Sequence, residues 1–365
     1  MTKLSLAVFL IASLTLATLS SAQEHRRNHQ PKLTPQNSGT TQGLISVSPV
    51  NPRVVWVSGR GGTFVVTRDG GRHWQAGVVS GAESLEFRDV QGVSEKVAYL
   101  QSVGSNTTDF RIYKTIDGGA TWTMQFQNQL DGAFYDCFAF WTPKRGISHS
   151  DSVNGVFPDI RTKDGTTWQD ISANMPPALP GEFSFASSGT CVATQGARNA
   201  WIATGGASIA RILATRDGGD TWNAYDTPLV SSASAGAFTV AFRNPWRGIV
   251  GGGDLDPSDP NNAATATSHD GGKTWTLTNP PPVTGAIFGL SYVGNDFGHH
   301  RGRHGDDRAV VITANDGGAA WTPDEGNTWF TLPDVTGYWA VAFASPQAGW
   351  LVGTDGRILK ISFGH

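Results

Sequence analysis

The sequence predicts an all-β protein, a seven-bladed β-propeller built from four-stranded antiparallel blades. An eight-residue pattern, TRDGGDTW at 215–222 in its clearest copy, recurs along the chain. The copies stand about 50 residues apart, a period typical of stacked or radial β repeats. The chain also carries 45 Gly and 13 Trp but only 16% charged residues, a composition that favours short strands joined by glycine turns.

The repeated pattern, called the box from here on, places an aspartate third in each copy. These residues are Asp69, Asp117, Asp164, Asp217, Asp270 and Asp324. Such an aspartate accepts backbone N–H bonds from the residues after it and folds a tight turn. The glycine in fifth place allows a positive φ, and the closing tryptophan starts a new strand. We therefore interpret the six aspartates as structural residues, with a tighter or distorted turn in the shortened copy at 162–168.

Each repeat predicts four strands. An apolar strand such as 238–242 is followed by a polar turn and by a second strand that ends in glycine, such as 200–206. A third strand leads into the box, and the box tryptophan opens the fourth. Four antiparallel strands in about 50 residues form the pattern of a propeller blade. A β-sandwich is the alternative, but it does not explain the even period.

The ends of the chain predict how the ring closes. Inner strands are expected near Leu44, Phe87, Phe138, Cys191, Val240, Leu290 and Val341. The last repeat stops at 362, where its box would begin, so it lacks a fourth strand. We predict that Leu33–Gln36 pairs beside Ile358–Ile361, because closure removes the exposed edge of an open sheet.

Residues 1–22 predict a secretory signal peptide. Lys3 precedes a mostly apolar run at 4–19, and small residues reach Ala22 at the expected cleavage site. A membrane anchor is the alternative, although the run is short for a span. Residues 23–32 predict a mobile leader, which leaves a single propeller at 33–365. We expect an exported monomer, periplasmic or extracellular, with no membrane span in its mature form.

Export would permit a disulfide between Cys137 and Cys191. Both cysteines fall at similar positions on inner strands of adjacent repeats. Equivalent pleat positions are expected to point the same way around a ring and not at each other. We therefore favour two buried free thiols and keep the bridge as the open alternative.

The binding surface is expected on the face opposite the boxes, which we call the rim, where long crossovers connect the blades. Its best polar candidates are Glu86, Arg88, Asp89, Tyr135 and Asp136. Asp89 and Asp136 are expected to begin the inner strands of adjacent blades, so with Glu86 they could perform acid–base chemistry on a sugar. We favour the alternative, a hydrogen-bonded ring that satisfies strand ends. Tyr338 and Trp339 on the last crossover are candidates for a sugar or peptide platform.

Cofactor and metal signals are weak. Asp254, Asp256 and Asp259 could bind calcium, but a solvated loop is the favoured interpretation. The three histidines at 299–304 are likewise interpreted as part of a loop. Neither a glycine-rich dinucleotide motif nor a haem motif is present, so no cofactor is predicted. The net charge of −3 gives no electrostatic reason to expect nucleic acid or an anionic membrane as partner.

The boxes resemble the Asp-box (BNR-like) repeats of sialidases, sortilin-type receptors and photosystem II assembly/stability-factor propellers. The chain is most similar to the last group in its single-domain length, its signal and its T-x-D-G-G-x-T-W units. The resemblance covers about residues 33–365 and implies an exported seven-bladed propeller. It says little about function, because unrelated activities share these repeats.

Two functional hypotheses follow. The first is an exported, non-enzymatic propeller that binds a protein client, which the resemblance implies could be an assembly or stability factor. The second is a sialidase-like glycoside hydrolase that acts on a glycan through Asp89, Asp136 and Glu86. A sialidase needs three arginines to grip a carboxylate. Sialidases also carry an FRIP-like motif before their first box. Here the two similar motifs, FRDV at 87–90 and FRNP at 242–245, both follow the first box, and no arginine triad can be assembled from the sequence.

Overall fold

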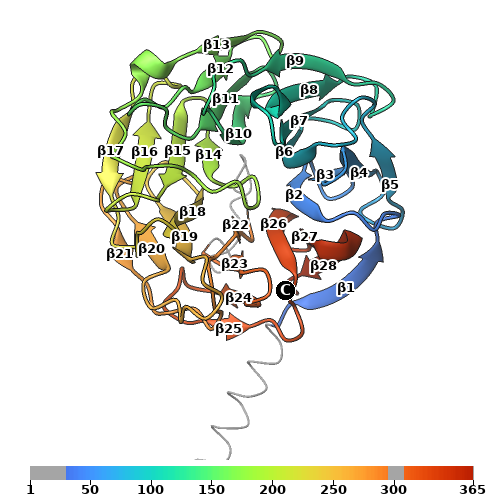
Figure 1. Cartoon of the computed structure of the whole chain (residues 1–365). Helices are drawn as coiled ribbons and strands as arrows, with labels where there is room; N and C mark the ends of the chain where they lie inside the picture. The colour runs from blue at the N-terminus through green and yellow to red at the C-terminus, as the bar shows by residue number, and fades with distance from the viewer. Residues whose placement is uncertain (1–29, 295–307, 365) are drawn as a thin grey trace, which may run out of the picture.

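The computed structural model of the protein describes residues 30–294 and 308–364, which form seven four-stranded antiparallel sheets around one axis (Figure 1). The predicted seven-bladed propeller is therefore confirmed. The predicted signal at 1–22, most of the leader and the histidines at 299–304 lie outside the described residues. Within the described ranges, no helix is long and apolar enough to cross a membrane.

Each blade runs from an inner strand at the axis to an outer strand at the circumference. The inner strands are β2 (Leu44–Pro49), β6 (Glu86–Gly92), β10 (Tyr135–Thr142), β14 (Val192–Gln195), β18 (Ala235–Phe242), β22 (Gly289–Tyr292) and β26 (Tyr338–Ser345). The second strands are β3 (Val55–Gly59), β7 (Ala98–Val103), β11 (Arg145–Ser150), β15 (Asn199–Thr204), β19 (Gly248–Asp254), β23 (Val310–Thr313) and β27 (Ala348–Gly353).

The third strands end at the boxes. They are β4 (Thr63–Thr67), β8 (Arg111–Thr115), β12 (Ile160–Thr162), β16 (Arg211–Thr215), β20 (Thr265–Ser268), β24 (Ala319–Thr322) and, without a box, β28 (Arg357–Ser362). The outer strands are β5 (Gln75–Val78), β9 (Thr123–Gln127), β13 (Trp168–Asp170), β17 (Asn223–Asp226), β21 (Thr276–Leu277), β25 (Phe330–Thr331) and β1 (Lys32–Asn37). Helical structure in the described residues is limited to η1 (Thr107–Asp109), η2 (Ser172–Asn174) and η3 (Thr354–Gly356).

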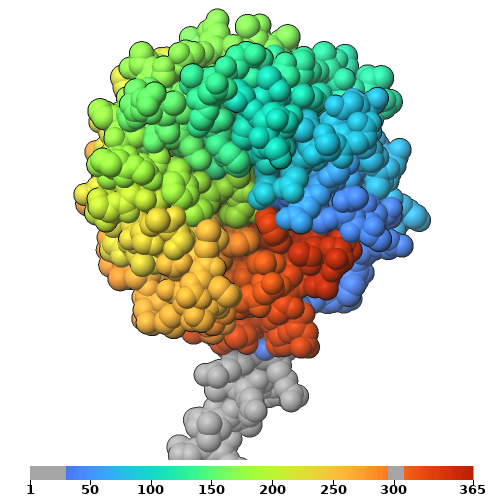
Figure 2. Space-filling model, viewed as in Figure 1, coloured from blue at the N-terminus to red at the C-terminus, as the bar shows by residue number. Residues whose placement is uncertain are grey.

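The ring closes as predicted. Strand β1 pairs antiparallel with β28, with Leu33 opposite Ile361 and Gln36 opposite Ile358. The N-terminal strand thus supplies the outer strand of the blade formed by the C-terminal segment. Figure 2 shows these blue and red ends of the chain side by side on the surface. No blade is left with an unpaired third strand.

The core is divided among the interfaces between blades. Trp56, Trp201 and Trp350 on the second strands are fully buried. The ring of Trp201 stacks on Phe242 of the next blade, with centroids 3.6 Å apart. Its indole N–H also donates to the carbonyl of Gly271 in the next box, at 2.8 Å. A second-strand tryptophan therefore joins one blade both to the core and to the turn of its neighbour.

The boxes form self-contained turns. Thr215 Oγ1 donates to Asp217 Oδ1 at 2.8 Å, and the same carboxylate accepts the N–H groups of Asp220 and Thr221 at 3.0 Å. In the copy at Asp117, bonds from the Thr121 hydroxyl and N–H lower the pKa of the carboxyl to about 2. In the shortened copy, the N–H of Gly165 donates to the hydroxyl of Thr162. The donor is three residues after the hydroxyl there, but four residues after it in complete boxes such as the one at Thr215.

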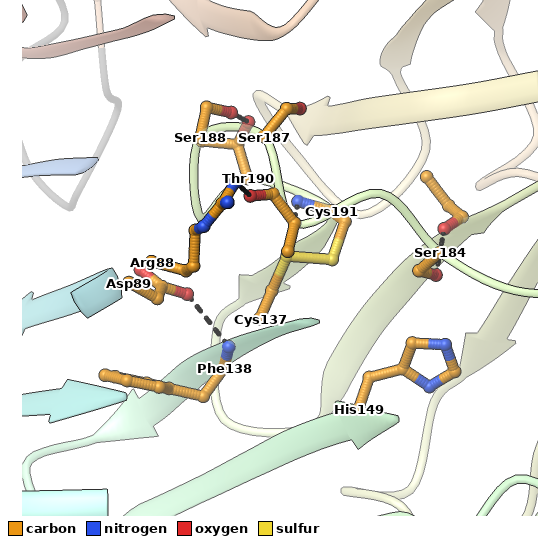
Figure 3. The surroundings of a disulfide bond; sticks show 12 residues. Arg88, Asp89, Cys137, Phe138, His149, Ser184, Ser187, Ser188, Thr190 and Cys191 are labelled. Carbon is orange, nitrogen blue, oxygen red and sulfur yellow. Dashed lines mark hydrogen bonds between the residues drawn. A yellow bond between two sulfur atoms is a disulfide. The ribbon is translucent and has the colours of Figure 1, made fainter. Parts of the chain in front are cut away.

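The expectation of two free thiols is wrong, because Cys137 and Cys191 form a disulfide (Figure 3). Their Cα atoms are 6.0 Å apart. Inner strands converge toward the axis, so equivalent residues on adjacent strands lie close enough to bond sideways. Thr190 and Thr239 also bond between neighbouring blades, with hydroxyl oxygens 2.8 Å apart. The bridge joins the third and fourth blades around the channel.

Candidate functional site

The rim ends of five inner strands carry a β-bulge at the same position. Each bulge inserts one residue that has no partner on the second strand, and these residues are Ile45, Arg88, Asp136, Phe238 and Trp339. A bulge interrupts the alternation of the strand and redirects the side chain of the inserted residue. Arg88, Asp136, Phe238 and Trp339 all line one hollow on the rim, of about 320 Å³.

Aromatic rings dominate this space, which we call the aromatic hollow. Phe185 stacks on Phe238 at 3.6 Å between centroids, and Phe238 lies parallel to Phe288 at 6.1 Å. Phe288 then meets Trp339 edge-on at 5.4 Å. Leu255 stands at the same hollow with 49% of its surface exposed. The result is a file of rings that crosses from the fifth blade to the seventh.

Two arginines cover the Trp339 end of the file. The guanidinium carbons of Arg60 and Arg88 lie 5.6 and 5.7 Å from the centre of the Trp339 ring. The carboxylate of Glu86 pairs with both, at 3.3 Å from Arg60 Nε and 2.8 Å from Arg88 Nη2. The structure therefore brings Arg88 and Trp339, two of the rim candidates, into one cluster. Cations over an indole face are attracted by its quadrupole.

Two carboxyl groups line the hollow from the third blade. Asp136 is 1% exposed and shares a hydrogen bond with Asp151. Burial, reinforced by the charge of Asp151, raises the pKa of Asp136 well above its usual range. Burial also raises the pKa of Asp151, which accepts the N–H of Ser184 at 2.9 Å. Two adjacent, poorly solvated carboxyls do not both ionise easily, so the pair keeps a proton to higher pH than isolated aspartates would.

A segment between β13 and β14, residues 183–190, lies across the rim end of the channel, and we call it the plug segment. Arg88 Nη1 donates to the carbonyl of Ala186 at 3.0 Å. The hydroxyl of Ser188 donates to the carbonyl of Phe288 at 2.5 Å. A Cβ at Gly189 would lie 2.3 Å from Asp89 Oδ1, so the segment passes directly over Asp89.

Below the plug segment, all seven inner strands line a channel of about 250 Å³. Asp89 faces this channel and not the aromatic hollow. Its carboxylate accepts the N–H groups of Phe138 at 2.8 Å and Val90 at 2.7 Å, and the hydroxyl of Ser46 at 3.2 Å. Burial raises the pKa of Asp89 well above its usual range. Asp89 thus satisfies strand ends across three blades.

Comparison with known proteins supports this architecture. No protein-family model matches the chain. Among curated proteins, it is similar to the photosystem II stability/assembly factor HCF136 of Cyanidioschyzon merolae, with 25% identity over 227 residues. The chain is a seven-bladed propeller homologous to that stability/assembly factor. The match covers 58% of this chain and 49% of the relative, so the chain spans about half the length of the curated protein it matches.

Solved propellers show the same fold as this one. YCF48 from Cyanidioschyzon merolae aligns with a TM-score of 0.61 and 17% identity, over 90% of this chain and 98% of its own. A structure described as YCF48 bound to D1 peptide aligns with a TM-score of 0.59 and 17% identity, over 91% and 96% of the two chains. The WD40 propeller domain of Doa1 gives 0.57 at 13% identity, over 91% and 97%.

The structure does not bring the three catalytic candidates together in this propeller. Asp89 faces the channel, Asp136 lines the aromatic hollow, and Glu86 is paired with two arginines. Asp89 and Asp136 were both expected at the start of inner strands of adjacent blades, near the channel mouth. The bulges instead make Arg88 the counterpart of Asp136, because each is the inserted residue of its strand. An offset of one residue sends the two carboxyls to different spaces.

Tyr135 was also misplaced by the sequence interpretation. It is 4% exposed, and its hydroxyl donates to the carbonyl of Pro158 at 2.9 Å, so it belongs to the core between blades. Tyr338 is half-buried against the core of the last blades. Only Trp339 of this aromatic pair lines the hollow. The inserted position of β26 is Trp339, and its neighbour Tyr338 therefore has a different orientation.

The weak metal candidates cap separate turns. Asp254 Oδ1 accepts the N–H of Asp256 at 3.0 Å, and Asp256 Oδ1 accepts the N–H of Ser258 at 2.9 Å. Asp259 Oδ1 accepts the N–H of Asn261 at 2.7 Å. Within residues 30–294 and 308–364, no group of three or more His, Cys, Asp or Glu is arranged to hold a metal ion.

Phe238 and Phe288 are among the site residues that sequence reasoning missed, since neither was a rim candidate. A signal was present. When the inner strands are aligned at their bulges, Arg88, Asp136, Phe238, Phe288 and Trp339 each precede a small or polar residue and then an apolar one. A core position would carry similar apolar residues in every blade. The large and varied residues at this aligned position instead indicate a binding surface.

Proposed function

We propose that this propeller is an exported, non-enzymatic protein that binds a segment of a client protein in the aromatic hollow, as an assembly or stability factor. The observation that carries the proposal is the convergence of bulge residues from several blades on one apolar space at the rim. Phe185 and Phe238 are themselves buried and form the floor of the hollow, and an apolar floor with a polar margin is typical of protein-binding sites. The exposed side chain of Leu255 extends that surface.

The similar proteins support the same function. The curated relative is described as a stability and assembly factor, and one solved neighbour is described as YCF48 bound to D1 peptide. A propeller of this architecture can therefore hold a peptide. For this chain, the client is proposed only as a protein segment, bound by a monomer.

Export to the periplasm or the extracellular space is part of the proposal. Residues 1–22 have the charge, apolar run and small residues of a cleaved signal. The buried disulfide between Cys137 and Cys191 supports the same location, since disulfides persist in oxidising compartments.

A site-specific photocrosslink tests the proposal. We would place a photoreactive phenylalanine analogue at Leu255 in the hollow and, as a matched control, at Trp246 in a turn on the box face. Trp246 is 58% exposed, and its carbonyl accepts the N–H of Gly271 in a box. Irradiation in the native host should give a discrete protein adduct at Leu255 that Phe288→Leu abolishes. Adducts of equal yield at both positions, or at neither, would contradict a rim-binding function.

A further inference from the structure

The aromatic hollow has a geometry suited to one kind of side chain. Its rings stand 3.6 to 6.1 Å apart from centre to centre along the file from Phe185 to Trp339. Aromatic pairs prefer offset-stacked or edge-on contacts with centroids about 4.5–7 Å apart. A further ring can therefore extend the file, whereas an aliphatic chain would fill the same space without that contact geometry.

The charged groups around the hollow disfavour a charged occupant. At one end, Arg60 and Arg88 lie over Trp339 and would repel a lysine or arginine side chain. From the third blade, Asp136 and Asp151 already share a buried site and would repel a further carboxylate. Like charges brought together in a poorly solvated site are destabilising. Because groups of both signs border the hollow, a neutral side chain is the one that meets no like charge at either end.

Unpartnered polar atoms add a second requirement. Asp136 Oδ2, Arg88 Nε and Trp339 Nε1 are buried and make no hydrogen bond among the described residues, and all three residues line the hollow. Asp136 Oδ2 is a buried carboxyl oxygen that receives no hydrogen bond from the described residues. Buried polar groups are nearly always paired in native proteins. Three unpartnered polar atoms on residues that line one hollow indicate a ligand that both donates and accepts hydrogen bonds.

We propose that the client inserts a tyrosine side chain into the aromatic hollow. The tyrosine ring extends the row of aromatic rings. Its hydroxyl donates a hydrogen bond to Asp136 Oδ2 and accepts one from Arg88 Nε. Small rotations of the lining side chains expose Asp136 Oδ2 and Arg88 Nε to the tyrosine hydroxyl as the ring enters. This inference rests on the proposed function, because it names the anchor of the client segment that the hollow binds.

The test is selection from a library of random peptides displayed on phage, with the mature protein immobilised. We expect selected peptides to share a tyrosine and to lose binding to Phe288→Leu but not to the control variant Trp246→Ala. Synthetic peptides then separate the parts of the side chain. Tyr→Phe should weaken binding about tenfold or more, in keeping with two lost hydrogen bonds, and Tyr→Leu should weaken it further.

A variant of the acceptor residue, combined with the Tyr→Phe peptide, tests whether Asp136 and the tyrosine hydroxyl interact. In Asp136→Leu, which removes Oδ2, the preference for the tyrosine peptide over the phenylalanine peptide should shrink to the part contributed by Arg88. If Asp136→Leu does not fold, the Tyr→Phe comparison on the natural protein decides alone. Selected peptides without a shared tyrosine, or with equal affinity after Tyr→Phe, would overturn the anchor while leaving client binding intact. Failure to select any peptide that binds the rim would overturn both proposals.

Discussion

Trp350 on β27 donates its indole N–H to Oε1 of Gln36 on β1 at 3.2 Å, although 314 positions separate the two residues. The same oxygen accepts the indole N–H of Trp74, which closes the first box, at 3.1 Å. One amide oxygen thus ties the N-terminal strand to the last blade and to the first. These two hydrogen bonds to Gln36 lie at the junction between the last and first blades, where the propeller closes.

Replacing this amide should loosen the closure. Gln36→Leu removes the acceptor of two indole N–H groups, so we expect the free energy of unfolding to fall by about 1–3 kcal/mol. Urea unfolding followed by tryptophan fluorescence would measure it. Gln169→Leu is the matched control, because Gln169 is an exposed glutamine of the outer strand β13. Equal losses in the two variants would mean that the closing bonds do not stabilise the ring.

The boxes should affect stability and not binding. Asp217→Ala removes the acceptor of the Asp220 and Thr221 N–H bonds and of the Thr221 hydroxyl. We expect a loss of about 1–3 kcal/mol in the free energy of unfolding. Affinity for rim-binding peptides should stay unchanged, because the box lies on the opposite face. Asp226→Ala, an exposed site on the next strand, is the control. A loss of binding with unchanged stability would instead place a ligand at the box.

The disulfide should contribute a measurable part of the stability. Replacing both Cys137 and Cys191 with alanine removes a cross-link over a sequence separation of 54 residues. Cross-links of this kind contribute about 2–4 kcal/mol to the free energy of unfolding. Reducing agent should lower the stability of the natural protein to that of the double variant and leave the variant unaffected. A natural protein that unfolds identically with and without reductant, after complete reduction is verified, would refute this.

The acid pair should make stability fall as pH rises. Burial raises the pKa of Asp136 and Asp151 above the usual aspartate value of 3.8 in the folded protein. The folded state then binds more protons than the unfolded state above that value. Stability is therefore fully present below the unfolded pKa and declines as pH rises through the folded pKa.

Asp136→Asn should flatten this decline, because the amide can bond to Asp151 without holding a proton. Urea unfolding from about pH 4 to about pH 9 would measure the slope. The exposed Asp226→Asn is the control and should keep the natural slope. The boxes act with the opposite sign, since Asp117 has its pKa lowered to about 2 and loses its contribution as pH falls toward that value. An Asp136→Asn slope equal to that of the natural protein would show that the pair does not titrate.

The sequence by itself determined the blades, their number and the closure of the ring. Those features depend on local chemistry that repeats: an aspartate and glycine that fold a turn, and a tryptophan that resumes a strand. The missing box after Ile361 and the unmatched strand at Leu33 were enough to predict their pairing. Each inference needed only neighbours in the chain and a count of repeats.

Only the tertiary structure decided which side chains meet at the rim. A bulge depends on how two strands pair, and it redirects Arg88, Asp136, Phe238 and Trp339 into one space while Asp89 turns to the channel. The disulfide depends on how closely inner strands converge at the axis, a separation that no local pattern encodes. A shift of one residue changes the face that a side chain occupies, so the site is set by strand register across blades.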